Sequence, residues 1–140
     1  MQPAPPYSAR RRWAGRILSA LPVLMLTFSG SIKLMKIDPV IQSFRQLGYS
    51  ENLAYLIGTL ELGCVAVYLI PRTAIIGAIL MAAYLGGAVA THLRAGDPLL
   101  THTVFPVYFG VLAWAGLYLR DERLASILSS PALAAETSTK

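Results

Sequence analysis

Glu61 and Lys33 are charged residues that lie within apolar runs of the chain. Glu61 is in the middle of the run 53–70, and Lys33 lies near the end of the run 13–35. A carboxylate at membrane depth costs about 2.5 to 3.5 kcal/mol on insertion scales, so it normally faces a bundle interior or a wet cavity and has a partner there. If the two runs are antiparallel, both charges lie in the same half of the bilayer. We therefore expect Glu61 and Lys33 to pair.

A paired carboxylate inside a helix bundle has two uses. It can transfer protons as an acid or base in a lipophilic pocket. It can also be purely structural, bonded to Lys33 or to Tyr84 so that it fixes the helix register. Lys33 has an alternative as well, because its long stem can carry the ammonium group to the membrane interface. These alternatives stay open at the level of sequence.

Helical spacing brings further side chains close to Glu61. One face of the run 53–70 carries Glu61 and four residues at spacings of three and four: Ala54, Gly58, Val65 and Tyr68. A rise of 1.5 Å per residue puts Tyr84 of the run 73–93 at about the same depth as Glu61, so a hydrogen bond between them is feasible. Our candidate catalytic residues are Glu61, Lys33 and His92, and the candidate substrate contacts are Tyr84, Gly58, Ser29, Thr91 and Ala88.

Metal and redox motifs are weak in this chain. His92 and His102 could ligate haem, but both lie at helix ends beside loops, and no third ligand is spaced for a metal site. We expect interfacial histidines and no metal. The single cysteine, Cys64, allows neither an intrachain disulfide nor a CxxC pair, and we interpret it as a small buried hydrophobe. No nucleophile constellation, P-loop or dinucleotide fingerprint is present.

Composition indicates a small membrane domain. The chain has 140 residues, of which 14% are charged, and a mean hydropathy of +0.55. Ordinary soluble domains carry roughly 25% charged residues. The net charge of +5 comes from basic residues scattered at the ends of apolar runs, without a basic stripe interleaved with aromatics, so we expect a lipid bilayer and no nucleic acid as the partner.

Four apolar stretches predict an all-α fold, a bundle of four transmembrane helices at 13–35, 53–70, 73–93 and 104–119. Pro71 and Arg72 make a tight turn between the second and third helices. The connection 36–52 has room for a short interfacial helix at 40–47. The membrane domain is then 13–124, between tails 1–12 and 125–140 that are expected to be disordered.

The distribution of Lys and Arg predicts the orientation. Eight of these residues lie on the side of the termini and four on the other side, so both termini should be cytoplasmic and the protein should lie in the inner membrane. The first apolar run continues past a typical signal-peptide core and lacks an A-x-A cleavage site, so we expect an anchor helix. Ala78, Ala82, Gly86 and Ala90 form a small-xxx-small stripe, which predicts a close helix contact within the bundle or between protomers of a homo-oligomer.

Five short motifs together resemble the DoxX-like family. They are FSGSIKL at 28–34, LGY at 47–49, IGTLEL at 57–62, PR at 71–72 and YLGGAVATHLR at 84–94. The resemblance implies a bacterial membrane protein of four helices, with relatives that include a thiosulfate:quinone oxidoreductase subunit and a component of a membrane oxidoreductase complex. The family's recurring Lys, Glu and His correspond to Lys33, Glu61 and His92.

Two functions are compatible with these features, and whether the protein is an enzyme stays open. In the first, the bundle binds a quinone or an apolar substrate, and Glu61 acts as acid/base in redox-linked or isomerisation-type chemistry. In the second, the protein is a non-enzymatic subunit or chaperone of an oxidoreductase complex, and its buried charges are structural. Cys64 leaves no dithiol, so sulfur or quinone chemistry would need an external partner or a bound cofactor. A cavity lined by Glu61 and Tyr84 would favour the first function.

Overall fold

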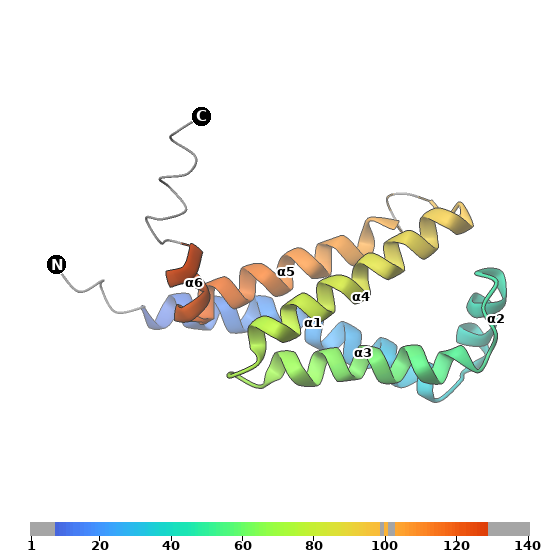
Figure 1. Ribbon diagram of the computed structural model, residues 1–140, viewed down its shortest axis with the longest axis horizontal. Coiled ribbons are helices and arrows are strands. Elements are labelled where there is room, and N and C mark those ends of the chain that lie inside the picture. The colour runs from blue at the N-terminus through green and yellow to red at the C-terminus, as the bar shows by residue number, and fades with distance from the viewer. Residues whose placement is uncertain (1–7, 99, 101–102, 129–140) are drawn as a thin grey trace.

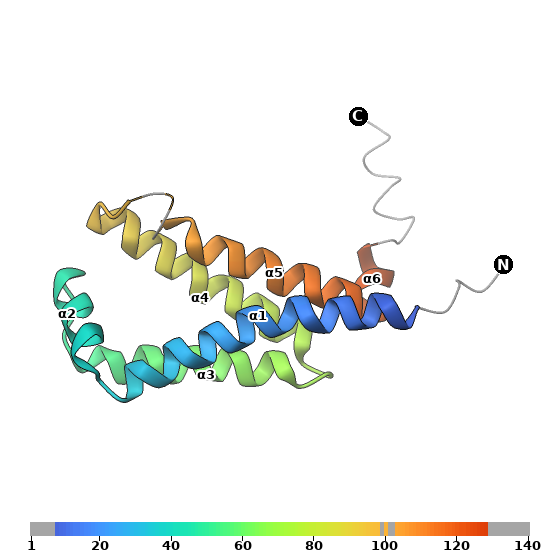
Figure 2. The same ribbon diagram turned by 180° about the vertical axis from the view of Figure 1, so that it is seen from behind.

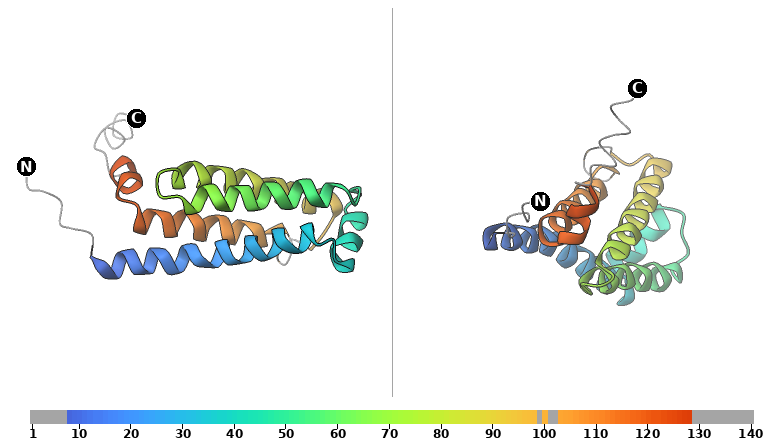
Figure 3. Two further views of the ribbon diagram at one scale, coloured as in Figure 1. Left: turned by 90° about the horizontal axis from the view of Figure 1, so that it is seen from below. Right: turned by 60° about the vertical axis from the view of Figure 1, so that its left-hand side comes forward.

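The computed structural model describes residues 8–98, 100 and 103–128. Within them the chain forms helices and no strand, which confirms the all-α class (Figure 1). The six helices are α1 (Ala9–Leu34), α2 (Asp38–Gln46), α3 (Leu53–Leu69), α4 (Ala74–Ala95), α5 (Phe105–Arg120) and α6 (Glu122–Leu128). The long helices α1, α3, α4 and α5 form a bundle, with α2 at one end and α6 at the other (Figure 3).

Two of these helices are long and apolar enough to cross a membrane, by length and composition. They are α1, with 26 residues, and α4, with 22. The apolar helix α3 has 17 residues and is shorter. The structure thus contains two candidate spans among the described residues, where the sequence predicts four.

The first helix starts earlier than expected. It begins at Ala9 and not at residue 13, because the Ser8 hydroxyl accepts a hydrogen bond from the Arg11 backbone N–H at 3.3 Å and caps the helix. Residues 9–12, which the sequence predicts to be part of a disordered tail, are therefore helical. Helix α4 also continues two residues past its expected end and stops at Gly96, whose φ of 74° suits a left-handed C-terminal cap.

A second correction concerns the C-terminal side. Helix α6 crosses the expected boundary at residue 124, so residues 125–128 are helical. The Asp121 carboxylate accepts hydrogen bonds from the backbone N–H groups of Arg123, at 2.9 Å, and Leu124, at 3.4 Å, which satisfies the start of the helix. Leu124 and Ala125 are buried, which holds the short helix against the bundle.

Glycines bring the helices into close contact at the end of the bundle near α6. A Cβ atom added to Gly77 of α4 would lie 2.3 Å from the Tyr68 Cα of α3, and one added to Gly15 of α1 would lie 2.7 Å from the Gly116 carbonyl oxygen of α5. Only residues without a side chain permit such approaches. Both helix pairs, α3 with α4 and α1 with α5, are therefore tightly joined at this end.

The other end of the bundle opens. Gly30 and Gly58 join α1 to α3 there, since a Cβ on Gly58 would lie 2.9 Å from the Gly30 carbonyl oxygen. A Cβ on Gly86 of α4, in contrast, would meet nothing within 4 Å. Figures 1 and 2 show the pair α1 and α3 diverging from the pair α4 and α5 toward α2. The expected close contact at Gly86 is therefore wrong within the bundle, although Ala78 of the same stripe is fully buried.

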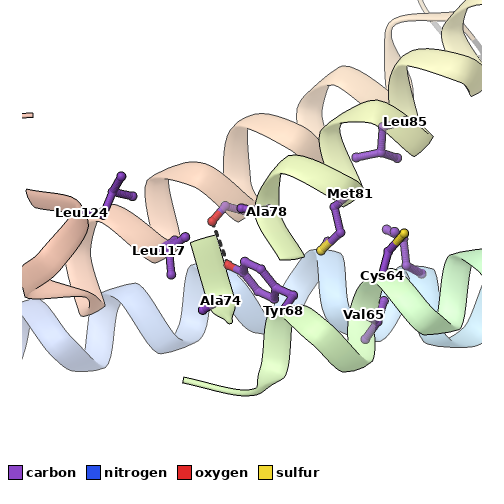
Figure 4. Packing of buried hydrophobic residues seen from close by; sticks show 11 residues of the cluster. Cys64, Val65, Tyr68, Ala74, Ala78, Met81, Leu85, Leu117 and Leu124 are labelled. Carbon is purple, nitrogen blue, oxygen red and sulfur yellow. Dashed lines mark hydrogen bonds between the residues drawn. The ribbon is translucent and has the colours of Figure 1, made fainter. Parts of the chain in front are cut away.

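A chain of hydrogen bonds also holds the closed end. Tyr68, which is fully buried, donates its hydroxyl hydrogen to the Ala113 carbonyl at 2.7 Å (Figure 4). The Ser19 hydroxyl lies 2.9 Å from the Tyr68 hydroxyl. Because the Tyr68 hydrogen is already donated to Ala113, Ser19 must be the donor to Tyr68. Arg120 in turn donates to the Ser19 hydroxyl oxygen at 3.1 Å. The chain of bonds connects α1, α3 and α5.

Candidate functional site

The divergence of the helix pairs leaves a cavity of about 610 Å³ in the half of the bundle near α2. Small-molecule sites usually occupy about 300 to 1,000 Å³. All four long helices line this cavity, and α2 with the following turn contributes Phe44, Leu47 and Tyr49 at its outer end. Most of the lining is apolar, with a few polar groups among the hydrophobic side chains. This composition suits a lipophilic molecule that carries a small polar part.

The predicted pair of Lys33 and Glu61 is confirmed. Lys33 Nζ lies 2.8 Å from Glu61 Oε2, and the two side chains are 17% and 3% exposed. The ammonium group also donates to the Ser29 hydroxyl and, at 3.5 Å, to the Ser29 carbonyl one turn earlier on α1. These acceptors use all three hydrogens of the ammonium group. Lys33 is therefore held inside the bundle, against α3.

Tyr84 approaches the same carboxylate from the opposite side of the cavity. Its side chain lines the cavity from α4 and interacts with the Glu61 carboxylate. Ala88 and Thr91 line the same wall farther along α4, toward α2. Glu61 thus belongs to α3, pairs with a cation on α1 and meets a hydroxyl on α4, so three helices determine its position.

His92 lies at the outer end of the cavity and is oriented by Asp97. His92 Nδ1 and Asp97 Oδ2 are 2.6 Å apart. The left-handed turn at Gly96 folds the chain back, and the Asp97 N–H donates to the His92 carbonyl at 3.1 Å. A carboxylate on one ring nitrogen sets the tautomer and orientation of the imidazole. Asp97 therefore positions His92.

A polar bridge closes the outer end of the cavity. The Tyr49 hydroxyl lies 2.8 Å from the Thr91 hydroxyl, and Arg94 donates to the Leu47 carbonyl at 2.8 Å. The Arg94 guanidinium also lies over the Tyr49 ring, 5.9 Å from its centroid. These contacts connect the segment after α2 to the last turns of α4, at the end of the bundle where the two helix pairs have diverged.

The cavity contains most of the candidates from the sequence. Seven of them line it: Glu61, Lys33, His92, Tyr84, Ser29, Thr91 and Ala88. Gly58 lies instead at the contact between α1 and α3, where it meets Gly30 and Lys33. The lining also includes aromatic residues that were not candidates, Phe44, Tyr49, Phe105 and Phe109. The amphipathic spacing of Val40, Phe44 and Leu47 was a usable signal for α2.

Potential metal-ligating side chains form no cluster in the part of the chain that the structure describes. No group of three or more His, Cys, Asp and Glu side chains there could hold an ion. His92 is the one histidine among the described lining residues, and its Nδ1 is engaged with Asp97. His102, the other candidate haem ligand, lies outside the described residues.

Comparison with protein-family models shows which family the chain belongs to. The model of the DoxX-like family matches residues 17–116. The chain belongs to the DoxX-like family. The match extends from the first third of α1 into α5, and it includes every residue that lines the cavity. Comparison with curated proteins and with solved structures gave no match. Membership of the DoxX-like family, together with the apolar helices α1 and α4, indicates a membrane protein.

Proposed function

We propose that this DoxX-like protein binds a small, uncharged, lipophilic molecule in the cavity between its helix pairs. The observation that carries the proposal is a cavity of suitable size whose apolar wall holds the Lys33 and Glu61 pair. The two opposite charges compensate each other at 2.8 Å, so the site presents no net charge at this point to an incoming ligand. A neutral molecule with an oxygen or nitrogen function fits such a site.

The proposed topology has four spans, α1, α3, α4 and α5, in the inner membrane with both termini in the cytoplasm. The bundle supports it because these four helices all lie along the long axis of the molecule, while α2 lies at one end and α6 at the other (Figure 1). The excess of Lys and Arg on the side of the termini supports the orientation. The cavity then lies in the outer half of the bilayer.

The proposed chemistry is proton transfer. Glu61 would take a proton from the ligand or return one to it. A ligand oxygen atom would replace the Ser29 carbonyl, the most distant of the three Lys33 acceptors at 3.5 Å, and accept hydrogen bonds from the Lys33 ammonium group and the Tyr84 hydroxyl. His92, held by Asp97, lies at the outer end of the same cavity and could exchange protons with water there. An isomerisation of the ligand would need only these proton transfers and hydrogen bonds.

Redox-linked chemistry would require a bound carrier. A quinone fits the cavity by volume, by its aromatic lining and by the donors Lys33 and Tyr84, and it would supply the electron-accepting carbonyl groups. Those residues would bind and orient a quinone carbonyl, and Glu61 could hold the accompanying proton.

A second candidate is a non-enzymatic subunit or chaperone of an oxidoreductase complex. It is favoured by the complete pairing of Lys33 with Ser29 and Glu61, since a charge pair that is already satisfied can fix α1 against α3 without any ligand. In that case the activity belongs to the partner protein, and the cavity holds a structural lipid.

A homo-oligomer is also proposed, through the outer face of α4. Gly86 lies there in an apolar groove between α4 and α5, and it is open to contact from another protomer. Replacing Gly86 with Leu should then reduce the oligomer without unfolding the protomer, because the new side chain blocks close backbone approach. Unchanged oligomer size in cross-linking and light scattering would argue against this contact.

Mass spectrometry of co-purified molecules tests the binding function. The protein is purified in nanodiscs and extracted with organic solvent, as wild type, as Ala88→Trp, which fills the cavity, and as Ala66→Trp, which carries the same side chain on an exposed position of α3. The proposal predicts a small molecule enriched over the nanodisc lipids in wild type and Ala66→Trp but not in Ala88→Trp. Equal extracts from all three proteins would contradict it.

A further inference from the structure

We propose that the ligand reaches the cavity sideways from the lipid, through the flank between α3 and α4, and not from water at the α2 end. This inference rests on the proposed function, because it specifies how the same cavity is filled. It also assigns the ligand to molecules dissolved in the membrane, and it gives Ala83 and Gly87 a role in admitting them.

The flank is marked by residues that line the cavity and are also exposed on the outside of the bundle. Leu60 of α3 is 55% exposed and Leu80 of α4 is 41% exposed, and Ala83 and Gly87 of α4 are also exposed. Glu61, the neighbour of Leu60 in the sequence, is 2% exposed. The lining of the cavity therefore includes both the buried Glu61 carboxylate and surface residues of α3 and α4.

Helical geometry arranges the opening along α4. Leu80, Ala83 and Gly87 follow one another at spacings of three and four, so they form one stripe along the helix. This stripe lies beside the stripe of Tyr84, Ala88 and Thr91 that forms the inner wall. A molecule that passes the first stripe would meet the second directly.

Small side chains leave this flank unobstructed. A Cβ atom on Gly87 would meet nothing within 4 Å, and Ala83 adds only a methyl group. The flank between α1 and α5 is lined by larger groups, Met25 on α1 and the edge-to-face pair of Phe105 and Phe109 on α5, whose ring centroids are 4.9 Å apart. Of the exposed residues that line the cavity, those with the smallest side chains, Ala83 and Gly87, lie on the side between α3 and α4.

The aqueous end is bridged. Tyr49 is bonded to Thr91, and Arg94 is bonded to the Leu47 carbonyl, so two hydrogen bonds must break before α2 and α4 can separate. Polar molecules that come from water would meet these contacts first. An apolar molecule in the bilayer meets only the leucines and small residues of the flank.

Cys64 supplies a reporter for this route, because it is the only cysteine of the chain and it lines the cavity one turn from Glu61. The experiment uses the full-length protein in phosphatidylcholine and phosphatidylglycerol liposomes. Cys64 is labelled with N-(1-pyrenyl)maleimide, which dissolves in lipid, or with a trimethylammonium methanethiosulfonate, which stays in water. Intact mass gives the labelled fraction over time.

The variant Gly87→Trp places a large side chain at the opening, and Gly63→Trp is its matched control. Gly63 is also an exposed helical glycine whose added Cβ would meet nothing within 4 Å, but it lies outside the cavity. We expect the pyrenylmaleimide to label wild type and Gly63→Trp at similar rates and Gly87→Trp at least about tenfold more slowly. The charged reagent should label all three slowly. Ala83→Phe provides a second obstruction if Gly87→Trp does not fold.

The outcomes separate this route from the binding function. The lateral route would be overturned if the pyrenylmaleimide labelled Gly87→Trp and Gly63→Trp at equal rates. It would also be overturned if the charged reagent labelled the wild type faster than the pyrenylmaleimide did. Neither result would argue against the cavity itself. Failure of both reagents to label the folded wild type, with full labelling after unfolding, would also overturn the lateral route, because a lipid-soluble reagent that enters the cavity meets Cys64. The proposed function is tested separately, by the co-purified molecules.

Discussion

Gly77 of α4 lies against the backbone of Tyr68 in α3, so closely that a Cβ at Gly77 would stand 2.3 Å from Tyr68 Cα. This contact, beside the Pro71 turn, fixes the vertex from which the two helix pairs diverge. The cavity depends on it, because the helices can separate near α2 only if they are joined at the opposite end.

Replacing Gly77 with Ala should destabilise the protein, because the added methyl group overlaps the Tyr68 backbone and the helices must shift. We expect a loss of about 1 to 3 kcal/mol, as for overpacked cores. Gly63→Ala is the matched control, since its Cβ meets nothing within 4 Å. That change should stabilise α3 by up to about 1 kcal/mol through helix propensity. Thermal unfolding in detergent, followed by circular dichroism, should rank wild type between the two variants.

The Lys33 and Glu61 pair should show coupled stabilities. Glu61→Gln and Lys33→Met each leave one buried partner without its counter-charge, which costs about 3 kcal/mol, whereas the double variant should lose less than the sum. A thermodynamic cycle from thermal unfolding measures the coupling. For any activity or ligand binding that needs a proton-carrying group, the double variant should stay inactive. Stability losses that simply add would refute the coupling.

Acid should weaken the start of α6. The Arg123 guanidinium and the backbone N–H groups of Arg123 and Leu124 lower the pKa of the Asp121 carboxyl. A carboxyl whose pKa is lower in the folded state contributes stability above its unfolded pKa of about 3.9 and loses it as the pH falls through the folded value.

The variant Asp121→Ala isolates this contribution. It should be less stable than wild type by about 1 kcal/mol at pH 7, as for other helix caps, and the difference should shrink steadily below about pH 4. Thermal unfolding of both proteins between pH 7 and pH 2 measures it. A difference that stays constant over this range would mean that the Asp121 charge does not act as described.

The proposed topology predicts labelling of the connection around α2 from the outside of the cell. A Cys64→Ala background removes the native thiol, and cysteines at Gln42 or Asp97 then report the side on which each connection lies. Both positions should react with a membrane-impermeant maleimide in intact cells. Reaction only after the membrane is disrupted would reverse the orientation.

Helical periodicity alone predicts much of the site. It puts Glu61 on the same face as Ala54, Gly58, Val65 and Tyr68, and all five are buried. The antiparallel arrangement of α1 and α3 then makes the pairing with Lys33 predictable from depth alone. The same reasoning identifies Tyr84, Ala88 and Thr91 as one wall. These predictions need only the geometry of each helix and the expectation that a buried charge has a partner.

Other features depend on tertiary contacts that a single sequence does not encode locally. Periodicity puts Tyr68 on the inward face, but it does not predict that Ser19 and the Ala113 carbonyl satisfy its hydroxyl there. Gly86 belongs to the predicted small-residue stripe but meets nothing within 4 Å, whereas Gly77, which lies outside that stripe, meets the backbone of α3. Tyr49 reaches the cavity after the turn at Gly48, whose φ is 76°, and it bonds there to Thr91 of α4.

Equilibrium binding of a neutral aromatic probe tests the central claim most directly. The fluorescence of 1-aminoanthracene is titrated against nanodiscs that hold wild type, Ala88→Trp or Ala66→Trp, with empty nanodiscs subtracted. The cavity account predicts saturable binding by wild type and Ala66→Trp, and at least about tenfold weaker binding by Ala88→Trp, whose indole occupies the space beside Tyr84. Identical curves for all three proteins would contradict the account.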